Sequence, residues 1–295
     1  MQERGIRRRV WLWAIGVPLA YFLVWNILAA LNPSYSAERL LWPAEIAVRR
    51  IVSDPVSVPP SLVDRTLERL QKVVTRYPGS DAAGRAELLL GELYTARKEF
   101  DSARKTYRRI MVNYADKAQW VIEGYQAIAR TYLVEEAWPK AMETYRTLLK
   151  EYPQSPLTMD VPLQMVAVAR RHTADAGDAA LEEAIAHYKK IIRDVPKGRL
   201  SFLASRRLAG CYGMAGRWEE ALKTCETIVM DYPTQPEIPR IIWEAGELAK
   251  QKPHNPDWAQ KISREFAERY PARRQAVERW LAPAVPKTLP TPKAQ

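Results

Sequence analysis

The sequence predicts an all-α protein built from consecutive helical hairpins and preceded by one long apolar helix. Three observations support this fold class. Glycine is scarce, with 12 in 295 residues, and runs of Val, Ile and Thr are missing, which is typical of helical proteins. A residue pattern recurs from residue 61 onward with a nearly fixed period. Residues 10–31 form an uncharged stretch long enough to cross a membrane.

Composition and charge exclude several classes of protein. Apolar residues make up 47 % of the chain and charged residues 27 %, the balance of a folded rather than a disordered protein. The net charge is +11, but Arg4, Arg7, Arg8 and Arg9 cluster at the N-terminus and the remainder is spread through mixed-sign segments. Because no block of about five or six like charges occurs, we expect no nucleic-acid binding.

Residues 10–31 are predicted to form a transmembrane helix. As a helix the stretch is roughly 33 Å long, which matches a hydrocarbon core of about 30 Å. The four arginines before it favour a cytoplasmic N-terminus and export of everything that follows. We therefore expect a single-pass protein of a bacterial inner membrane, with the repeats on the periplasmic side.

A cleaved signal peptide is the alternative interpretation of the N-terminus. Ser34-Tyr35-Ser36 before Ala37 resembles a small-x-small cleavage site, which would release a secreted protein without residues 1–36. The apolar stretch is longer than the roughly 7–15 residues of a signal core, which favours the anchor.

The repeat is marked by helix-stopping pairs and by small residues at a fixed distance before them. The pairs are Tyr77-Pro78, Tyr114-Ala115, Tyr152-Pro153, Val195-Pro196, Tyr232-Pro233 and Tyr270-Pro271. The small residues are Thr66, Ala103, Ala141, Ala184, Ala221 and Ala259. Both series are spaced by 37, 38, 43, 37 and 38 residues. A period of this size indicates stacked helical hairpins.

Within each period the residues resemble the tetratricopeptide repeat (TPR). The second full repeat carries Ile128-Ala129, Tyr132, Trp138, Ala141, Tyr145, Leu148 and Pro153. The first and fourth repeats carry the same kinds of residue, beginning at Leu90-Gly91 and Leu208-Ala209. Small residues such as Gly91 and Ala103 let paired helices approach closely, and proline then ends the second helix. The resemblance implies a TPR-type solenoid over residues 61–281.

Three segments depart from the pattern. The third repeat carries extra residues, which we assign to a longer turn over 173–180. Residues 61–76 are predicted as an unpaired second helix, and residues 272–281 as a terminal capping helix. The resulting divisions are a basic tail and membrane span (1–31), a membrane-proximal helix and Pro-rich spacer (32–60), about five repeats with their cap (61–281), and a disordered Pro-rich tail (282–295).

The long links between repeats resemble those of exported bacterial cell-envelope TPR proteins. These include the outer-membrane barrel-assembly lipoproteins and the Tol–Pal coordinators. The chain has no cysteine near its N-terminus to carry a lipid and lacks the coiled coil of the coordinators. Neither specific role therefore transfers to this protein.

The membrane-proximal segment has two interpretations. A short helix over 37–51, interrupted by Pro43, carries Trp42 together with Leu40, Leu41 and Ile46, which could lie on the outer membrane surface. The same residues could instead pack on the first repeat.

No catalytic, metal or cofactor motif is present, so we expect no enzymatic activity, no cofactor and no small-molecule substrate. The three histidines match no metal-ligand spacing. Export would place Cys211 and Cys225 in an oxidising compartment, where a disulfide between them is one outcome and two buried thiols the other.

The TPR resemblance implies a concave face lined by the first helix of each repeat. The positions expected there include Arg85, Gln126, Arg130, Arg170 and Arg206. Our hypothesis is that the last three arginines form a basic stripe for an acidic or C-terminal peptide. The alternative is an ordinary solvated face.

These observations predict a membrane-anchored scaffold that binds a protein or peptide in envelope assembly or maintenance. Two other functions stay open: an accessory subunit that positions a partner enzyme, and a secreted binding module formed by signal cleavage.

Overall fold

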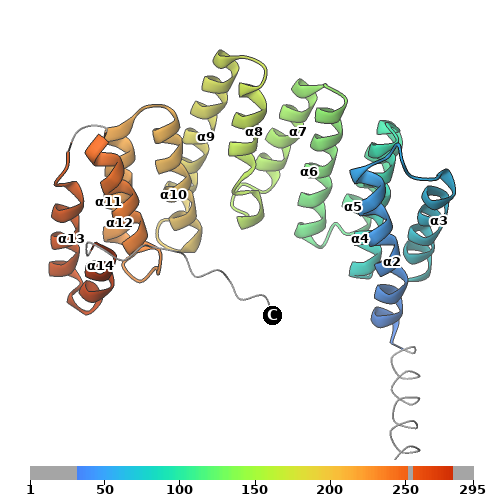
Figure 1. The fold of residues 1–295 in the computed structure, drawn as a ribbon, viewed down its shortest axis with the longest axis horizontal. Helices are drawn as coiled ribbons and strands as arrows, with labels where there is room; N and C mark the ends of the chain where they lie inside the picture. Colours follow the sequence, from blue (N-terminus) through green and yellow to red (C-terminus); the bar gives the residue numbers. More distant parts are fainter. Residues whose placement is uncertain (1–31, 252–254, 282–295) are drawn as a thin grey trace, which may run out of the picture. The chain divides into compact units, whose positions relative to one another are not determined.

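The computed structural model describes residues 32–251 and 255–281 (Figure 1). Regular structure within these ranges consists of thirteen α-helices and two short 3-10 helices, with no strand. The predicted membrane span at 10–31 and the tail at 282–295 lie outside the described residues. Among the helices that are described, none is long and apolar enough to cross a membrane. The chain divides into two compact parts, Met1–Tyr152 and Pro153–Gln295.

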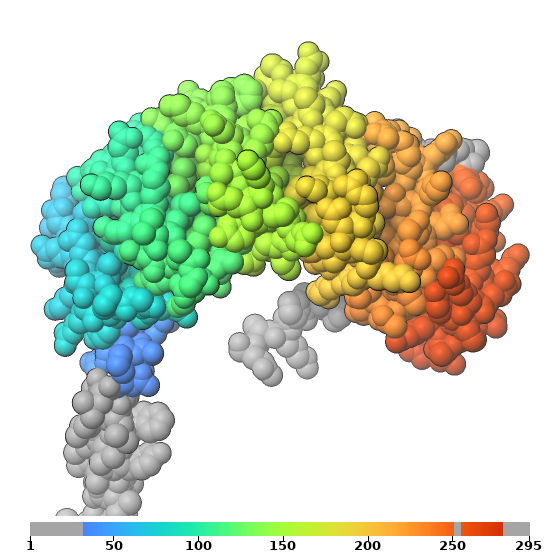
Figure 2. Space-filling view, turned by 180° about the vertical axis from the view of Figure 1, so that it is seen from behind, coloured from blue at the N-terminus to red at the C-terminus, as the bar shows by residue number. Residues whose placement is uncertain are grey.

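The described residues of the N-terminal part form three helical hairpins. Each pairs a first helix with a second helix: α2 with α3, α4 with α5, and α6 with α7. Their bounds are α2 Pro33–Ser53, α3 Pro60–Arg76, α4 Asp81–Ala96, α5 Phe100–Asn113, α6 Ala118–Val134 and α7 Trp138–Glu151. The first helix of each repeat also packs on the second helix of the hairpin before it. Figure 2 shows these helices, from blue to green, closing into one continuous surface.

Helix α2 corrects two predictions about the start of the stack. It is one continuous helix through Pro43, and it packs on both α3 and α4. Residues 61–76 are therefore not an unpaired helix, and the hairpins begin at Pro33. Five residues spaced by three or four hold α2 in place and are buried: Ala37, Leu41, Ala44, Val48 and Ile51. This apolar stripe explains why a proline on the exposed side does not end the helix.

One turn geometry closes the hairpin in three repeats. Lys98, Glu136 and Gly216 occupy the same repeat position, and each has a left-handed backbone with φ of 62°, 61° and 71°. The next residue donates its N–H to the carbonyl of the consensus tyrosine, as Glu99 does to Tyr94 at 2.8 Å. This is a Schellman-type C-cap, in which a left-handed residue ends the first helix.

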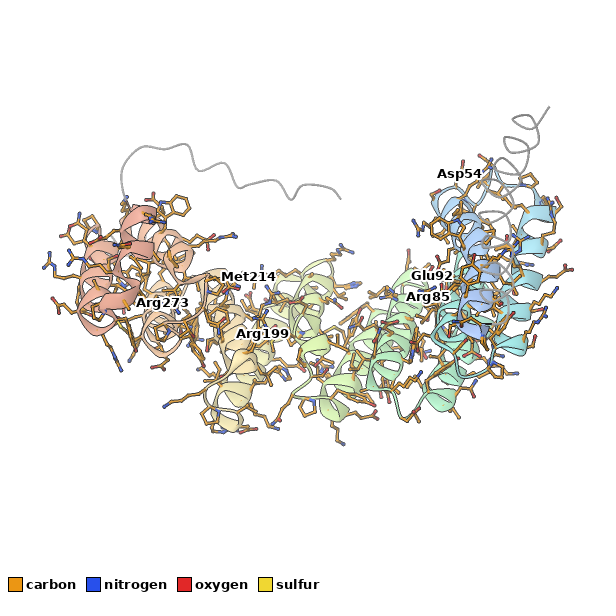
Figure 3. All side chains as sticks on the ribbon, turned by 90° about the horizontal axis from the view of Figure 1, so that it is seen from below. Asp54, Arg85, Glu92, Arg199, Met214 and Arg273 are labelled. Carbon is orange, nitrogen blue, oxygen red and sulfur yellow. The ribbon has the colours of Figure 1, made fainter. Side chains whose placement is uncertain are left out.

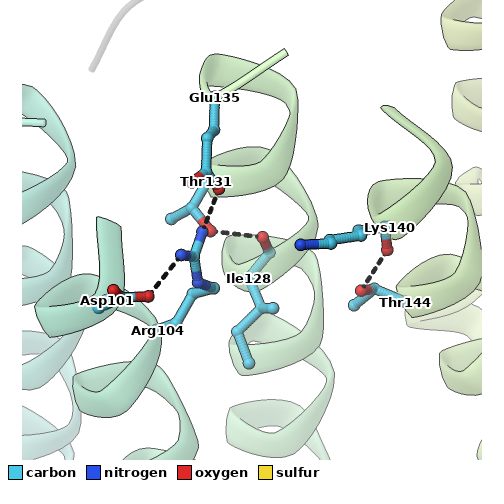
Figure 4. Close-up of polar contacts among 7 residues, drawn as sticks. All are labelled: Asp101, Arg104, Ile128, Thr131, Glu135, Lys140 and Thr144. Atoms are coloured by element: carbon cyan, nitrogen blue, oxygen red, sulfur yellow. Dashed lines mark hydrogen bonds and ion pairs between the residues drawn. The ribbon is translucent and has the colours of Figure 1, made fainter. Parts of the chain in front are cut away.

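A buried arginine ties consecutive hairpins together in the N-terminal part. Arg104 on α5 is 8 % exposed and forms ion pairs with Asp101 at 2.7 Å and with Glu135, which directly follows α6, at 2.6 Å (Figure 4). Its guanidinium lies 4.6 Å from the ring centre of Tyr132, also on α6. The ion pair with Glu135 and the stacked ring of Tyr132 therefore join the second helix of one repeat to the first helix of the next, while Asp101, on α5 itself, holds the guanidinium in place.

The C-terminal part contains the third to fifth repeats and a final helix. Its elements are η1 Pro156–Thr158, α8 Val161–Arg170, α9 Ala174–Asp194, α10 Arg199–Met214, α11 Trp218–Asp231, α12 Ile238–Gln251, α13 Trp258–Arg269, η2 Pro271–Arg273 and α14 Arg274–Leu281. Helices α8 and α9, α10 and α11, and α12 and α13 form the three hairpins.

The extra residues of the third repeat are helical, so the prediction of a long turn over 173–180 is wrong. Thr173 accepts a hydrogen bond from the backbone N–H of Ala176 at 3.1 Å and caps α9, which then runs for 21 residues. The capping threonine, an acidic first turn at Asp175 and several alanines favour an early helix start.

The last helix packs on both helices of the fifth repeat. The side chain of Val277 on α14 is 2 % exposed and belongs to the same core as Ile242 and Phe266. Helix α14 contacts α12 and α13, the position that the sequence predicts for a capping helix.

Candidate functional site

The first helices carry the residues predicted to bind a partner, and Arg85 is the first of these. Arg85 lies on α4 (Figure 3). Its guanidinium forms ion pairs with Glu38 and, at 3.4 Å, with Glu45, both on α2. The sequence left open that this segment packs on the first repeat, which the structure confirms, but it did not predict these ion pairs. Arg85 therefore contributes to the docking of α2 on α4.

Gln126 and Arg130 lie one turn apart on α6. Arg130 is exposed, Gln126 is half-buried, and neither has an ion-pair or hydrogen-bond partner among the described residues. The charge of Arg130 lowers the pKa of Glu92 on α4 and of Tyr145 on α7, so the guanidinium lies near both side chains. Although Glu92 is exposed, displacement of water by the surrounding helices raises the pKa of its carboxyl group, and Arg130 partly offsets that rise.

Arg170 is held by neighbouring helices in the C-terminal part. Its aliphatic stem lies on Gly177 of α9, where a Cβ would overlap it. Its Nη2 donates to the carbonyl oxygen of Met214, the last residue of α10, at 3.4 Å. A cation at a helix C-terminus stabilises the unpaired carbonyls there, so Arg170 acts chiefly within the fold.

Arg206 differs from Arg170 because its side chain is exposed to solvent and lines the edge of a cavity. Its guanidinium is 5.8 Å from the ring centre of Phe202 on the same helix. The cavity has a volume of about 250 Å³ and is enclosed by α10, α11 and α12. Its lining residues are Arg206, Ala209, Gly210, Ala221, Cys225, Ile228, Ile241, Glu244, Ala245 and Leu248.

The two cysteines are free thiols, so the disulfide that the sequence allowed is not formed in the structure. Cys211 is fully buried, and its charge raises the pKa of Tyr188 on α9, whereas the charge of Glu244 on α12 raises the pKa of Cys225. The thiols therefore face opposite neighbours of their own hairpin. Burial raises the pKa of Cys211 to about 11 and that of Cys225 to about 12.

Sequence reasoning missed a second hollow, in the N-terminal part. A cavity of about 570 Å³ lies between α5, α6 and α7, with Met111, Tyr125 and Tyr132 on its walls and Arg108 and Lys140 at its edges. The interleaved tyrosines and basic residues of these helices were the available signal, but they were explained by repeat packing alone.

Comparison with known families identifies the repeats. Residues 85–117 and 125–155 match the model of the tetratricopeptide repeat. The hairpins α4–α5 and α6–α7 are therefore tetratricopeptide repeats, as their residues predicted. TPR hairpins stack into binding surfaces for protein or peptide partners, and this chain is a helical-repeat protein that contains them.

Several solved structures are similar to the chain. A thermophilic TPR protein of Thermus thermophilus is 21 % identical, covers 67 % of this chain and 97 % of its own, and has a TM-score of 0.38. Human IFIT1, solved as a dimer with PPP-AAAA, is 19 % identical over 80 % of this chain and 50 % of its own, with a TM-score of 0.41. BtubC of P. vanneervenii is 14 % identical over 85 % and 96 %, with a TM-score of 0.39. None of the curated protein sequences compared with the chain matches it.

Proposed function

We propose that this protein is a membrane-anchored TPR scaffold that binds a protein segment along its first helices on the extracytoplasmic side of the membrane. The observation that carries the proposal is the contrast between the predicted binding residues. Arg85 and Arg170 are used within the fold, whereas Arg130 and Arg206 stay exposed and form no ion pair among the described residues. Exposed guanidinium groups beside an apolar groove favour a partner that carries carboxylates.

Two features support a position close to the membrane. The uncharged stretch 10–31 ends directly before α2, and arginines precede it. On α2, the side opposite the buried stripe presents Tyr35, Trp42 and Ile46 together with Arg39 and Arg49. Exposed aromatic and basic side chains on one helix face are typical of contact with lipid headgroups. The opposite face of the same helix packs on α3 and α4, so α2 can contact the membrane surface and the first repeats at the same time.

Site-specific crosslinking in intact cells tests the binding face. A photoreactive residue at Gln126 is expected to capture a partner, whereas one at Lys150, exposed on α7, is expected not to. The double variant Arg130→Glu/Arg206→Glu should lose the captured band. Lys105→Glu is the matched control, because it reverses an exposed charge on a second helix. Equal capture by all of these proteins would contradict a first-helix binding face.

The identity of the captured partner separates the scaffold from the accessory subunit. An envelope structural protein favours the scaffold, and an enzyme whose activity falls when the chain is deleted favours the accessory role. In either case the catalytic groups belong to the partner.

Membrane anchoring has its own test. Alkaline extraction should leave the chain in the membrane, and its intact mass should include residues 1–36. Protease added to spheroplasts should digest the repeats but spare a tag placed before residue 1. An intact mass lacking residues 1–36, with the chain in the soluble fraction, would instead establish the secreted module.

A further inference from the structure

One position in the repeats explains why α10, α11 and α12 enclose a cavity. Tyr107, Tyr145 and Tyr188 occupy the same position of the second helix in the first three repeats, and each is at most 3 % exposed. In the fourth repeat this position holds Cys225, which is much smaller. The ring that fills the hairpin interior in the first three repeats is therefore missing here, and the cavity occupies that space.

The first helix of the same repeat, α10, leaves the cavity open at Gly210. Gly210 stands where Glu92, Arg130 and Arg170 stand in the other repeats. A Cβ built on Gly210 would meet no atom within 4 Å. Two small residues on facing helices thus produce a hollow that reaches the surface of the first helices.

The walls of the cavity are suited to one aliphatic side chain. Ala209, Ile228, Ile241, Ala245 and Leu248 supply most of the lining. Its volume of about 250 Å³ is below the roughly 300–1,000 Å³ of sites that enclose whole small molecules. Because burial raises the pKa of the Cys225 thiol to about 12, the floor of the cavity is uncharged at neutral pH.

The charge at the opening is positive. Two carboxylates near it are paired within α12, Glu244 with Arg240 at 2.6 Å and Glu247 with Lys250 at 2.7 Å. Arg206 has no carboxylate partner among the described residues, and the ring of Phe202 lies beneath it. A ligand carboxylate placed next to the cavity would therefore complete an ion pair that the protein leaves open.

We infer that this cavity is a specificity pocket for an extended peptide that inserts one Leu, Ile or Met side chain and places an adjacent carboxylate on Arg206. The inference rests on the proposed function and narrows its ligand to an acidic segment with a single aliphatic anchor. All of its lining residues come from α10, α11 and α12, so the pocket is formed within the C-terminal part.

A random nonapeptide display library, selected on the full chain in mild detergent, tests the ligand. The enriched peptides should share an aliphatic residue next to Asp, Glu or the C-terminal carboxylate. In synthetic versions, changing the aliphatic residue to Ala, or the carboxylate to its amide, should each weaken binding at least about tenfold. Binding is measured by fluorescence anisotropy.

Variants of the pocket test its location. Gly210→Leu should fill the opening and Cys225→Tyr the floor, and each should weaken binding about tenfold or more. Gly210→Ala and Cys225→Ser keep the cavity open and should bind within about twofold of the wild-type chain. Arg206→Gln should weaken binding to acidic peptides, whereas Lys223→Glu, on the other side of α11, should not. Gly210→Leu keeps the test valid if Cys225→Tyr fails to fold, because no atom occupies that space.

The outcomes separate this inference from the proposed function. If enriched peptides bind Gly210→Leu as well as the wild-type chain but lose binding to Arg130→Glu, the pocket assignment is wrong and the first-helix binding face stands. If the library yields no peptide that binds the full chain, both are overturned.

Discussion

The ring of Tyr107 lies so close to the backbone of Gly91 that a Cβ placed on this glycine would overlap Cε1 and Cζ of the ring. The two residues come from α4 and α5, the helices of one hairpin. The same pair of positions in the fourth repeat holds Ala209 and Cys225, where the structure has a cavity instead of a contact. The residue at the Tyr107 position therefore determines whether the hairpin interior is filled, as in the first repeat, or contains a cavity, as in the fourth.

Substitution of Gly91 and of Gly210 by alanine should have opposite effects on the stability of the fold. Gly91→Ala is expected to lower the free energy of unfolding by about 1–2 kcal/mol, because overpacking at Tyr107 exceeds the gain in helix propensity. Gly210→Ala should raise it by about 0.5–1 kcal/mol, since the new methyl group meets open space. Urea unfolding of the full chain measures both. Equal shifts in the same direction would argue against the close approach at Gly91.

The hairpin turns offer a second prediction. Glu136 is exposed and has a left-handed backbone, a conformation that costs a residue with a Cβ about 1 kcal/mol. Glu136→Gly should therefore stabilise the protein by up to about 1 kcal/mol. Gly216, at the same position of the fourth repeat, supplies the reverse test. Gly216→Ala should destabilise by a similar amount, and thermal unfolding of the two variants should shift in opposite directions.

Glu87 makes the stability of the N-terminal part depend on pH. Its side chain is 1 % exposed, and Oε1 accepts from Arg109 at 2.9 Å and Asn113 at 3.4 Å. Oε2 has no hydrogen-bond partner among the described residues. Burial raises the pKa of this carboxyl group above its value in the unfolded chain, although Arg109 opposes the rise.

The raised pKa of Glu87 determines whether stability rises or falls with pH. Between the two pKa values the folded chain holds the extra proton, so the contribution of Glu87 is most favourable below the unfolded pKa, near 4.3. It is lost as pH rises through the folded-state pKa. Glu87→Gln should therefore gain about 1 kcal/mol relative to the wild-type chain between pH 4 and pH 7. Glu143→Gln, at an exposed position on α7, should show no such change in urea titrations at the two pH values.

The thiols provide a prediction about chemistry. With pKa values of about 11 and about 12, Cys211 and Cys225 are protonated at pH 8, and the thiol form reacts poorly. We expect both to resist iodoacetamide in the folded chain and to react once urea is added. Peptide mapping without reductant should find both thiols free. A peptide joining residues 211 and 225 would show that the hairpin rearranges to bring the two sulfur atoms together.

Much of the fold could be predicted because TPR packing uses small and aromatic residues at fixed spacing. Gly91, Ala129 and Ala209 mark where hairpins pack, and Tyr-Pro pairs mark where they end. Helix α2 escaped this pattern because its contacts with α3 and α4 use a plain apolar stripe without the signature residues. The start of α9 was missed because a capping threonine and alanine-rich turn outweigh the consensus turn position.

The site was harder to predict than the fold, because a position on a helix does not fix the partners of a long side chain. Arg85 and Arg170 occupy first-helix positions, yet one reaches α2 and the other the end of α10. The cavity beside Arg206 exists because Cys225 has no aromatic ring and Gly210 has no side chain to fill the space. The sequence contains both small residues, but it does not reveal whether the space beside them is open or filled by a neighbouring helix.

Two adjacent residues decide whether α2 belongs to the repeat stack. Leu41 is fully buried against α3 and α4, and Trp42 is 67 % exposed on the opposite side of the same helix. Leu41→Ala should lower the free energy of unfolding by about 2–5 kcal/mol, because it leaves a cavity in a packed interface. Trp42→Ala should change it by less than about 0.5 kcal/mol, although it removes the larger side chain. If α2 instead lay on the membrane through Trp42 and detached from α4, the two substitutions would reverse in effect, and urea unfolding of the detergent-purified chain would show it.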